Sequence, residues 1–352
     1  MPGVSVIIPT HARPERLRTL VRALANQSLE ASRYEVLVGV DGRDEVSERV
    51  AREAWGERKR DHDGLTVRVM EKQGQASVRN ALIREARGEL LVFLNDDMVP
   101  GPEFLSAHAR AHEDARNHAA LGSRPVIVIG ASPWTVPTPD RLFDRLLRET
   151  SMVFFHDQMT DPDPWRDWGF RHAWLLNLSV SAAAVREVGM LTAFPSTYGY
   201  EDDELAYRLH ASYGSPVLYR PEAIARHDHH YQPREYLERE FKLGYAALGF
   251  ARTTPACARE MFRRDVASED ERAYSAAFVE RERTGAARAM EPFESLARIP
   301  AHAISATSTD HTRELLTLLY QQHLPLKRWM WRAGLLAAHA GEPITRTRWP
   351  DE

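Results

Sequence analysis

The feature that most constrains the fold is a regular alternation of short apolar runs and amphipathic segments between residues 4 and 94. The runs 4–8, 35–40, 65–70 and 90–94 have the length of strands, and their nearly continuous apolar character is typical of strands buried on both faces of a parallel sheet. The segments between them carry apolar residues at helical spacing, and Pro14 suits the first position of a helix. We therefore predict an α/β fold with a mostly parallel central sheet flanked by helices.

Polar side chains follow two of these strands at the point where each strand ends. Asp41 comes directly after the second run, and Asn95, Asp96 and Asp97 come directly after the fourth. Ligands of open α/β sheets bind at the carboxyl ends of the strands, and Mg²⁺ prefers oxygen ligands that it shares with substrate phosphates. A tight turn is the alternative interpretation of each site, because Asp and Asn also favour turns.

The remainder of the chain is less regular and becomes helical towards its end. We expect strands over 125–130, 174–181 and 216–219, and helices over 102–117 and 138–155, with a further short helix ending near Gly189. From residue 233 the pattern is helical, over 236–252, 256–266, 273–283 and 312–340. We place a boundary near residue 232, with a catalytic domain over 1–232 (a donor half of about 1–130 and an acceptor half of about 131–232) and a helical region over 233–352.

Four acidic residues in succession, Glu201, Asp202, Asp203 and Glu204, open a predicted helix. Acidic residues in a first turn stabilise the helix dipole, which is the structural explanation. Neighbouring like charges also raise the pKa of a carboxyl group, which favours a role as general base. Both interpretations stay open at this point.

Three histidines, His227, His229 and His230, lie in a short polar segment that follows the last predicted strand. Neutral imidazole is a common metal ligand, and His227 and His229 share one face if the segment is extended. The alternative is a solvated loop.

Composition excludes several classes of protein. The net charge of −4 gives no reason to expect a nucleic-acid partner. Cys257 is the single cysteine of 352 residues, which rules out an internal disulfide and most zinc clusters. The first strand begins at Val4, which leaves no room for a signal peptide, and no apolar run approaches the ~18 residues needed to span a bilayer. We expect a cytoplasmic protein.

Over residues 3–232 the chain resembles a family 2 glycosyltransferase with the GT-A fold. The resemblance begins with the segments 4–10, 13–15 and 35–42, together with Gln27. Its middle part comprises Gly74, the segments 79–81 and 86–88, and the segment 93–97, which stands where that family has its DxD metal motif. The segments 177–180 and 199–209, together with Gly189 and His227, resemble the acceptor half. Each piece is short, but their order along the chain is informative.

The resemblance implies an inverting transfer of a sugar from a nucleotide-diphosphate donor, most often a UDP-sugar, to an acceptor hydroxyl. The donor-binding residues that it implies are Pro9, Thr10, His11, Arg13, Asp41, Gly74, Arg79, Asn95 and Asp96. A divalent cation, Mn²⁺ or Mg²⁺, is expected at Asp97 and His227, with Asn95 and His229 as alternative ligands. Asp202 is the expected general base. Glu201, Asp203, Trp174, Asn177 and Tyr200 are expected on the acceptor side.

Two positions depart from the family pattern. Ala12 stands where the family usually has Asn, and Asn95 replaces the first carboxylate of the DxD motif. Because Asn95 is neutral, a sugar-nucleotide-binding protein without transferase activity is one alternative. A sugar-1-phosphate nucleotidyltransferase is another alternative. Such enzymes have a glycine-rich loop directly after the first strand, and the segment 9–13 contains no glycine.

The acceptor is not defined by the sequence and could be a saccharide, a lipid-linked sugar or a small molecule. Trp165, Trp168 and Trp174 are candidates for stacking on a sugar ring, and core packing explains them equally well. The helix that contains 315–336 carries leucines and a basic, tryptophan-bearing stretch. Such a helix can lie on a membrane surface. Packing on the catalytic domain or a homodimer contact through the C-terminal helices are the other interpretations.

Overall fold

The computed structural model describes residues 3–56, 64–195, 199–304 and 309–352, and the chain forms two compact units. Unit 1 consists of Met1–Thr135, Thr160–Ala193 and Glu201–Asp228. Unit 2 consists of Val136–Met159, Phe194–Tyr200 and His229–Glu352. Unit 1 contains the polar clusters at 41, 95–97 and 201–204.

A seven-stranded sheet with the order β3-β2-β1-β4-β7-β6-β8 forms the centre of unit 1. β1, β2, β3 and β4 are mutually parallel where they pair, and β6 and β8 are parallel to each other. β7 runs antiparallel to both of its neighbours, β4 and β6. The strands are β1 (Val4–Thr10), β2 (Tyr34–Asp41), β3 (Leu65–Met70), β4 (Leu90–Leu94), β6 (Ile127–Gly130), β7 (Asn177–Ser181) and β8 (Val217–Arg220).

Three of the four apolar runs form the centre of this sheet and are buried on both faces, whereas β3 is its edge strand and exposes Arg68 and Val69, contrary to the prediction. Every residue of β1, β2 and β4 is buried. The predicted α/β fold with a mostly parallel sheet is confirmed, and the predicted bounds of the first four strands agree with the structure to within two residues. All four strands end at one edge of the sheet, so Thr10, Asp41 and Asn95 are brought to the same edge.

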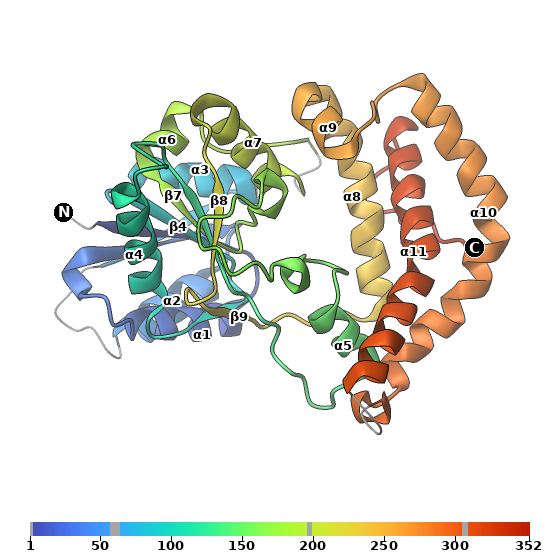
Figure 1. The fold of residues 1–352 in the computed structure, drawn as a ribbon, viewed down its shortest axis with the longest axis horizontal. Coiled ribbons are helices and arrows are strands. Elements are labelled where there is room, and N and C mark those ends of the chain that lie inside the picture. The colour runs from blue at the N-terminus through green and yellow to red at the C-terminus, as the bar shows by residue number, and fades with distance from the viewer. Residues whose placement is uncertain (1–2, 57–63, 196–198, 305–308) are drawn as a thin grey trace. The chain divides into compact units, whose positions relative to one another are not determined.

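Helices cover the sheet of unit 1. In Figure 1, α3, α6 and α7 lie on one face of the sheet, and α1 and α2 lie on the other. Buried Leu17, Leu20, Val21 and Leu24 give α1 its apolar face, as their helical spacing predicts. The helices are α1 (Pro14–Ala25), α2 (Glu45–Gly56), α3 (Gln75–Glu85), α4 (Phe104–Asn117), α6 (Ala182–Glu187) and α7 (Glu201–Tyr213).

A separate two-stranded antiparallel sheet, formed by β5 (Met98–Pro100) and β9 (Ala225–His227), was not expected from the sequence. Each strand has three residues, too few to show an alternating pattern. In this ladder Met98 pairs with His227. The pairing brings the residue that precedes Met98 next to the histidine segment.

Two predicted elements are shorter than expected. The helix predicted over 138–155 is limited to α5 (Leu142–Glu149), where buried Leu142, Phe143, Leu146 and Leu147 supply the apolar face. The strand predicted over 174–181 begins only at Asn177, because the backbone before it turns through the short 3-10 helix Phe170–His172.

Unit 2 is helical, as the sequence from residue 233 predicts. Besides α5 it contains α8 (Pro233–Thr253), α9 (Pro255–Phe262), α10 (Glu269–Ser295) and α11 (Thr309–His339), with α8, α10 and α11 side by side (Figure 1). Two glycines allow α8 and α11 to approach closely. A Cβ atom on Gly244 would lie 1.8 Å from the carbonyl oxygen of Trp331, and one on Gly334 would lie 2.0 Å from that of Phe241.

The basic, tryptophan-bearing stretch of α11 lies inside unit 2. Trp329 is 1% exposed and donates a hydrogen bond from Nε1 to the carbonyl oxygen of Val279, at 2.9 Å. Lys327 Nζ lies 3.7 Å from buried Glu240. These side chains therefore do not form the membrane-facing surface suggested by the sequence. Over the ranges that the structure describes, none of the helices combines the length and the hydropathy that crossing a bilayer requires.

Candidate active site

A cavity of about 220 Å³ opens at the carboxyl ends of β1, β2 and β4. Thr10 and Asp41 are the last residues of their strands, and Asn95 is the first residue after β4. The cavity therefore occupies the edge of the sheet at which the sequence predicted ligand binding. It is lined by Pro9, Thr10, His11, Arg13, Asp41, Gln75, Asn95 and Asp96.

Asp41 holds the loop that leads into α3. Its carboxylate accepts hydrogen bonds from the backbone N–H of Gln73 at 2.7 Å and of Gly74 at 3.2 Å. Gly74 has φ +87°, a conformation that glycine adopts without the strain of a side chain. Of the predicted donor-binding residues, Gly74 thus shapes the wall of the cavity through its backbone.

His11 is fixed on the same wall. Its Nδ1 atom lies 2.6 Å from the carbonyl oxygen of Asp41, so Nδ1 carries the hydrogen, because a carbonyl can only accept. Nε2 is then the acceptor for Lys72 Nζ at 3.1 Å. The ring is neutral in this arrangement and presents a fixed edge to the cavity. Lys72 was not among the predicted site residues.

Asp96 and Asp97 are both 6% exposed and share one arginine. Arg13 Nη1 donates to Asp96 Oδ1 at 3.1 Å and to Asp97 Oδ2 at 3.3 Å. Thr10 Oγ1 donates to the other oxygen of Asp96 at 2.8 Å. Arg16 Nη1 lies 3.8 Å from Asp97 Oδ2. Burial raises the pKa of Asp96, the charge of Asp97 acts in the same direction, and Arg13 opposes both.

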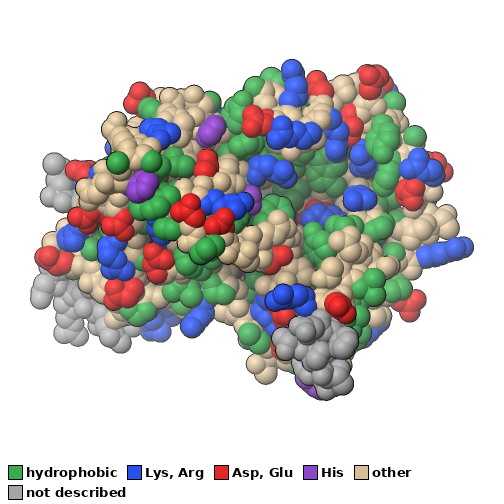
Figure 2. Space-filling view, viewed as in Figure 1, with side chains coloured by type: hydrophobic (Ala, Val, Ile, Leu, Met, Phe, Trp, Pro, Cys, Tyr) green, Lys and Arg blue, Asp and Glu red, His purple; other side chains and the backbone are tan. Residues whose placement is uncertain are grey.

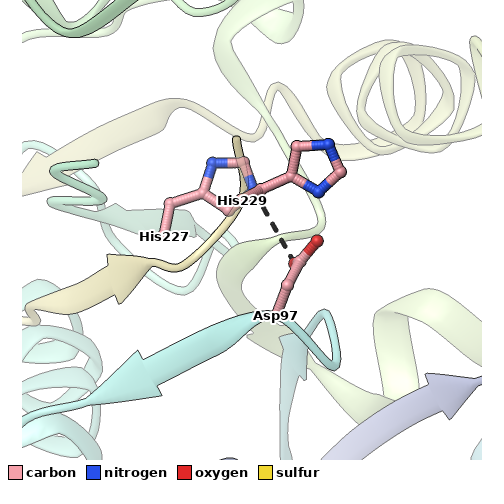
Figure 3. A group of neighbouring side chains, drawn as sticks. All are labelled: Asp97, His227 and His229. Atoms are coloured by element: carbon pink, nitrogen blue, oxygen red, sulfur yellow. Dashed lines mark ion pairs between the residues drawn. The ribbon is translucent and has the colours of Figure 1, made fainter. Parts of the chain in front are cut away.

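The second oxygen of Asp97 faces the histidine segment. Asp97 Oδ1 lies 3.7 Å from His227 Nε2. His229 follows two residues later along the chain, and one possible ligand atom from each of these three residues lies within 4.8 Å of the other two (Figure 3). Among the residues that the structure describes, these three side chains form a group whose spacing suits the binding of one metal ion.

The position of His227 is fixed by the backbone on both sides. The β5–β9 ladder pairs it with Met98, and the N–H of Asp228 donates to the carbonyl oxygen of Asp97 at 2.7 Å. The N–H of His227 donates to the carbonyl oxygen of Pro133 at 2.9 Å. The Trp134 ring lies against the imidazole with a centroid distance of 4.3 Å. Asp97 and His227 therefore converge although they are far apart in the sequence.

Arg79 is buried behind the cavity and does not line it. It is 2% exposed, its Nη2 donates to Asn95 Oδ1 at 2.7 Å, and its Nη1 lies 3.8 Å from Glu201 Oε1. The expected place of Arg79 near the base or the phosphates of a donor stays a prediction. The side chain links the end of β4 to the first residue of α7.

The acidic start of α7 contains carboxyl groups in two different environments. Glu204 turns inward and pairs with Arg208 at 2.6 Å, which explains it structurally. Asp202 and Asp203 are half-buried. Burial raises the pKa of Asp202, and the positive charge of Arg79 opposes this rise. Burial and the negative charge of Asp202 together raise the pKa of Asp203 well above its usual value. The expectation that mutual repulsion perturbs these acids fits this arrangement, although burial is the larger cause.

Three residues expected on the acceptor side are buried. Asn177 is 2% exposed; its amide donates to the carbonyl oxygens of Ala131 and Ala223, and its Oδ1 lies 2.9 Å from His108 Nε2. Tyr200 belongs to unit 2, where its ring stacks on Phe250 with a centroid distance of 4.8 Å. Trp174 is 9% exposed. Asn177 and Tyr200 thus have packing and hydrogen-bonding roles, and their expected place on the acceptor side stays a prediction.

Arg16 and Trp134 are further residues of the site that sequence reasoning missed. Arg16 lies in the first turn of α1, three residues after the N-cap residue Arg13, and this spacing was present in the sequence. Nothing in the sequence near Trp134 indicated a contact with His227.

Comparison with known families identifies the region that carries the donor-side cavity. The sequence model described as glycosyl transferase family 2 matches residues 5–169. Residues 5–169 belong to glycosyl transferase family 2. The family expected from the resemblance is confirmed, and Asp202 and His227 lie beyond the matched region.

Relatives of the chain include validoxylamine A glucosyltransferase from Streptomyces hygroscopicus subsp. jinggangensis, 29% identical over 62% of this chain and 53% of that protein. A protein of Bacillus subtilis named uncharacterized glycosyltransferase YfnE is 24% identical over 64% of each chain. The chain spans about half the length of the first curated relatives it matches.

The fold agrees with that of a solved member of this class. The mannosyltransferase PcManGT from Pyrobaculum calidifontis matches with a TM-score of 0.50 and 18% identity, over 96% of this chain and 86% of that one. At this identity the likeness concerns the fold alone. The predicted GT-A architecture with a helical C-terminal region is confirmed.

The side chains at the end of β4 fit a divalent cation. The carboxylate oxygen and the imidazole nitrogen that Asp97 and His227 offer lie 3.7 Å apart, a separation that one cation with ligand distances of about 2.0–2.3 Å can bridge. Asn95 is half-buried and bonded to Arg79, so its oxygen is engaged away from His227. Asp97 and His227 are therefore the better candidates, with His229 as a third.

Proposed function

We propose that this chain is an inverting glycosyltransferase that moves a sugar from a nucleotide-diphosphate donor to an acceptor hydroxyl. The family match over residues 5–169 and the relatives named as glycosyltransferases support the class of reaction. A UDP-sugar is the first donor to test, since UDP-sugars are frequent in the resembling family, and GDP- and dTDP-sugars follow. We retain the division into a catalytic domain over 1–232 and a helical region over 233–352 as part of this proposal.

The donor would occupy the cavity at the ends of β1, β2 and β4. Asp41 and the fixed edge of His11 offer acceptors and a ring surface to a base and ribose, and Arg13 offers a guanidinium to the phosphates. Asp41 already accepts two backbone N–H bonds, and a carboxylate has capacity for more. The base is thus expected on the β2 side and the diphosphate on the β4 side.

A divalent cation, Mn²⁺ or Mg²⁺, would be held by Asp97 and His227, with His229 assisting. When bound, such a cation stabilises negative charge on a departing diphosphate. The structurally similar mannosyltransferase was solved with GDP-Man and Mn²⁺, which supports this choice of probe. The oxygen and imidazole donors of this chain carry the proposal independently of that likeness.

Asp202 is the proposed general base. Its carboxylate would accept the proton of the acceptor hydroxyl while the hydroxyl oxygen forms a bond to the anomeric carbon. The bond between that carbon and the phosphate oxygen breaks, and the nucleoside diphosphate leaves with the electron pair. A raised pKa suits this role because a base is most effective when its pKa lies near the working pH. A single displacement inverts the anomeric centre.

The observation that carries the proposal is the link through Arg79. This one buried guanidinium contacts Asn95 at the donor cavity and lies 3.8 Å from Glu201, the neighbour of Asp202. Burial lowers the pKa of Arg79, and the negative charges of Glu201, Asp202 and Asp96 all oppose this lowering. The two acidic clusters therefore belong to one electrostatic assembly, as a single reaction requires.

Release of nucleoside diphosphate from UDP-, GDP- and dTDP-sugars tests the proposal. We expect turnover with one donor class in Mn²⁺ and little in a chelator. Binding of the nucleotide without release of diphosphate would favour the sugar-nucleotide-binding alternative. Formation of a sugar nucleotide from a sugar-1-phosphate and a nucleoside triphosphate would favour the nucleotidyltransferase.

The acceptor and the cellular setting remain predictions. A saccharide, a lipid-linked sugar and a small molecule are all compatible with a hydroxyl acceptor, and Trp165 or Trp168 could stack on a ring. Acidic and basic side chains are interspersed over the face seen in Figure 2, so this face offers no extended basic surface for nucleic acid. Cytoplasmic localisation, a peripheral membrane contact and a homodimer through the C-terminal helices are retained as expectations.

A further inference from the structure

The carboxylate of Asp97 has its two oxygens in different surroundings. Oδ1 lies 3.7 Å from His227 Nε2, on the side where a cation would bind. Oδ2 lies 3.3 Å from Arg13 Nη1 and 3.8 Å from Arg16 Nη1. A carboxylate that coordinates a cation on one side is thus held by guanidinium groups on the other.

The local charges balance without any added cation. Asp96 and Asp97 contribute two negative charges, Arg13 and Arg16 contribute two positive charges, and Asn95 contributes none. A cation arriving alone would therefore meet a cluster in which two guanidinium groups lie within 3.8 Å of Asp97 Oδ2. Because both carboxylates are only 6% exposed, water screens the guanidinium charges weakly.

Arg13 also lines the donor cavity. Its side chain is 42% exposed, whereas the carboxylates that it contacts are buried. A guanidinium binds phosphate oxygens in a two-pronged geometry as readily as it binds carboxylates. A diphosphate in the cavity would therefore compete with Asp96 and Asp97 for Arg13.

We propose that Arg13, supported by Arg16, makes cation binding depend on the donor. In the free protein the two arginines neutralise Asp96 and Asp97 and keep the affinity for a divalent cation low. When the diphosphate of a donor takes over the guanidinium of Arg13, Asp97 becomes available and the cation binds between it and the phosphates. Cation and donor then bind together. This inference rests on the proposed donor site and adds an order of assembly to it.

Mn²⁺ binding, followed by the electron paramagnetic resonance signal of free Mn²⁺, tests the proposal without any transfer reaction. UDP is the nucleotide, with GDP and dTDP in parallel and with correction for Mn²⁺ bound by nucleotide alone. Wild type is compared with Arg13→Gln, Arg13→Lys and Arg16→Gln. Arg18→Gln is the matched control, because Arg18 lies on the same helix and its nearest acidic groups are Glu15 and Glu53.

We expect Arg13→Gln to bind Mn²⁺ alone about tenfold more tightly than wild type, since one positive charge beside both carboxylates is removed. Arg16→Gln should show a smaller gain, because Arg16 is farther away and approaches only one of the two carboxylates. Arg13→Lys, which keeps the charge, should gain less than Arg13→Gln, and Arg18→Gln should resemble wild type. UDP should tighten Mn²⁺ binding about tenfold in wild type and much less in Arg13→Gln.

An Arg13→Gln protein that melts like wild type yet binds Mn²⁺ no more tightly overturns the proposal, and so does wild-type Mn²⁺ affinity that UDP leaves unchanged. Failure of the proposed function looks different. Mn²⁺ and UDP would then bind with the expected dependence on Arg13, but no sugar would be transferred from any donor.

Discussion

The two acidic clusters of unit 1 contain similar residues in opposite electrostatic settings. Asp96 and Asp97 receive hydrogen bonds from Arg13, and Asp96 also receives one from Thr10. Asp202 and Asp203 follow Glu201 in the first turn of α7, and buried Arg79, which lies 3.8 Å from Glu201, opposes the rise in the pKa of Asp202. Arg13 and Thr10 oppose the rise in the pKa of Asp96, whereas the charges of Asp202 and Glu201 add to the rise in the pKa of Asp203.

The difference indicates what each cluster can do. Arg13 and Thr10 oppose the rise that burial causes in the pKa of Asp96, and such donors can be exchanged for a cation. A carboxylate beside other acids and partly desolvated holds its proton more tightly, which suits an acceptor of protons. Two clusters of nearly the same composition thus serve as cation site and base because of their neighbours.

Asp202→Asn gives the largest expected effect. The amide cannot accept the proton of the acceptor, so we expect kcat to fall ~10²–10⁴-fold while UDP and Mn²⁺ still bind. In wild type the acid limb of the pH dependence of kcat/KM should lie above the ordinary Asp pKa of 3.8. Asp114→Asn, an exposed acid on α4, is the control. Full activity of Asp202→Asn would remove it from the role of base.

Asp97→Asn should abolish the stabilisation of the folded protein by Mn²⁺ in the presence of UDP. For wild type at one hundred times the dissociation constant, binding adds about 2.7 kcal/mol to the free energy of unfolding, seen as a higher melting temperature. The variant should show almost none of this shift, because the cation loses its carboxylate ligand. An equal shift in both proteins would place the cation elsewhere.

Arg79→Met tests the link between the clusters. The variant removes the buried guanidinium that bonds to Asn95 and lies near Glu201, so we expect a loss of about 1–3 kcal/mol in the free energy of unfolding, measured by urea titration. Activity should fall as well, because the start of α7 loses its connection to the donor cavity. Arg84→Met, exposed on the same helix, should change little. If the two variants behave alike, the two clusters are independent.

Asp203→Asn should have the smallest effect and the opposite sign. Because the pKa of Asp203 is raised in the folded protein, the free energy of unfolding falls as the pH rises from 3.8 through the raised value. Asn removes this loss. The variant should melt on the order of 1–3 °C above wild type at neutral pH, and the difference should vanish near pH 3. A lower melting temperature at neutral pH would contradict the raised pKa.

The sequence predicted the sheet well because burial on both faces leaves a direct trace in composition. β1, β2 and β4 are apolar runs with polar or glycine boundaries, and their limits could be placed to within two residues. The direction of β7 could not be predicted, since a strand has the same residue pattern whether it runs parallel or antiparallel to its neighbours. The three-residue strands β5 and β9 are too short to leave a pattern.

The candidate site was predicted in residue type and in part in position. Asp97 and His227 do converge, but the ladder between Met98 and His227 that brings them together is a tertiary feature. A sequence motif likewise does not show in which direction a side chain points. Arg79 and Asn177 stand at matching positions, yet both point into the protein, and only the folded structure distinguishes a residue that lines a cavity from one that supports it.

The central claim is that the cation site and the donor cavity serve one bound nucleotide. Relaxation of the ³¹P resonances of UDP by Mn²⁺ tests it most directly, because the effect falls steeply with the distance between metal and phosphorus. We predict strong broadening of both phosphorus signals in wild-type protein and its loss in Asp97→Asn, with UDP still bound. Broadening that persists in Asp97→Asn, or its absence in wild type, would contradict the claim.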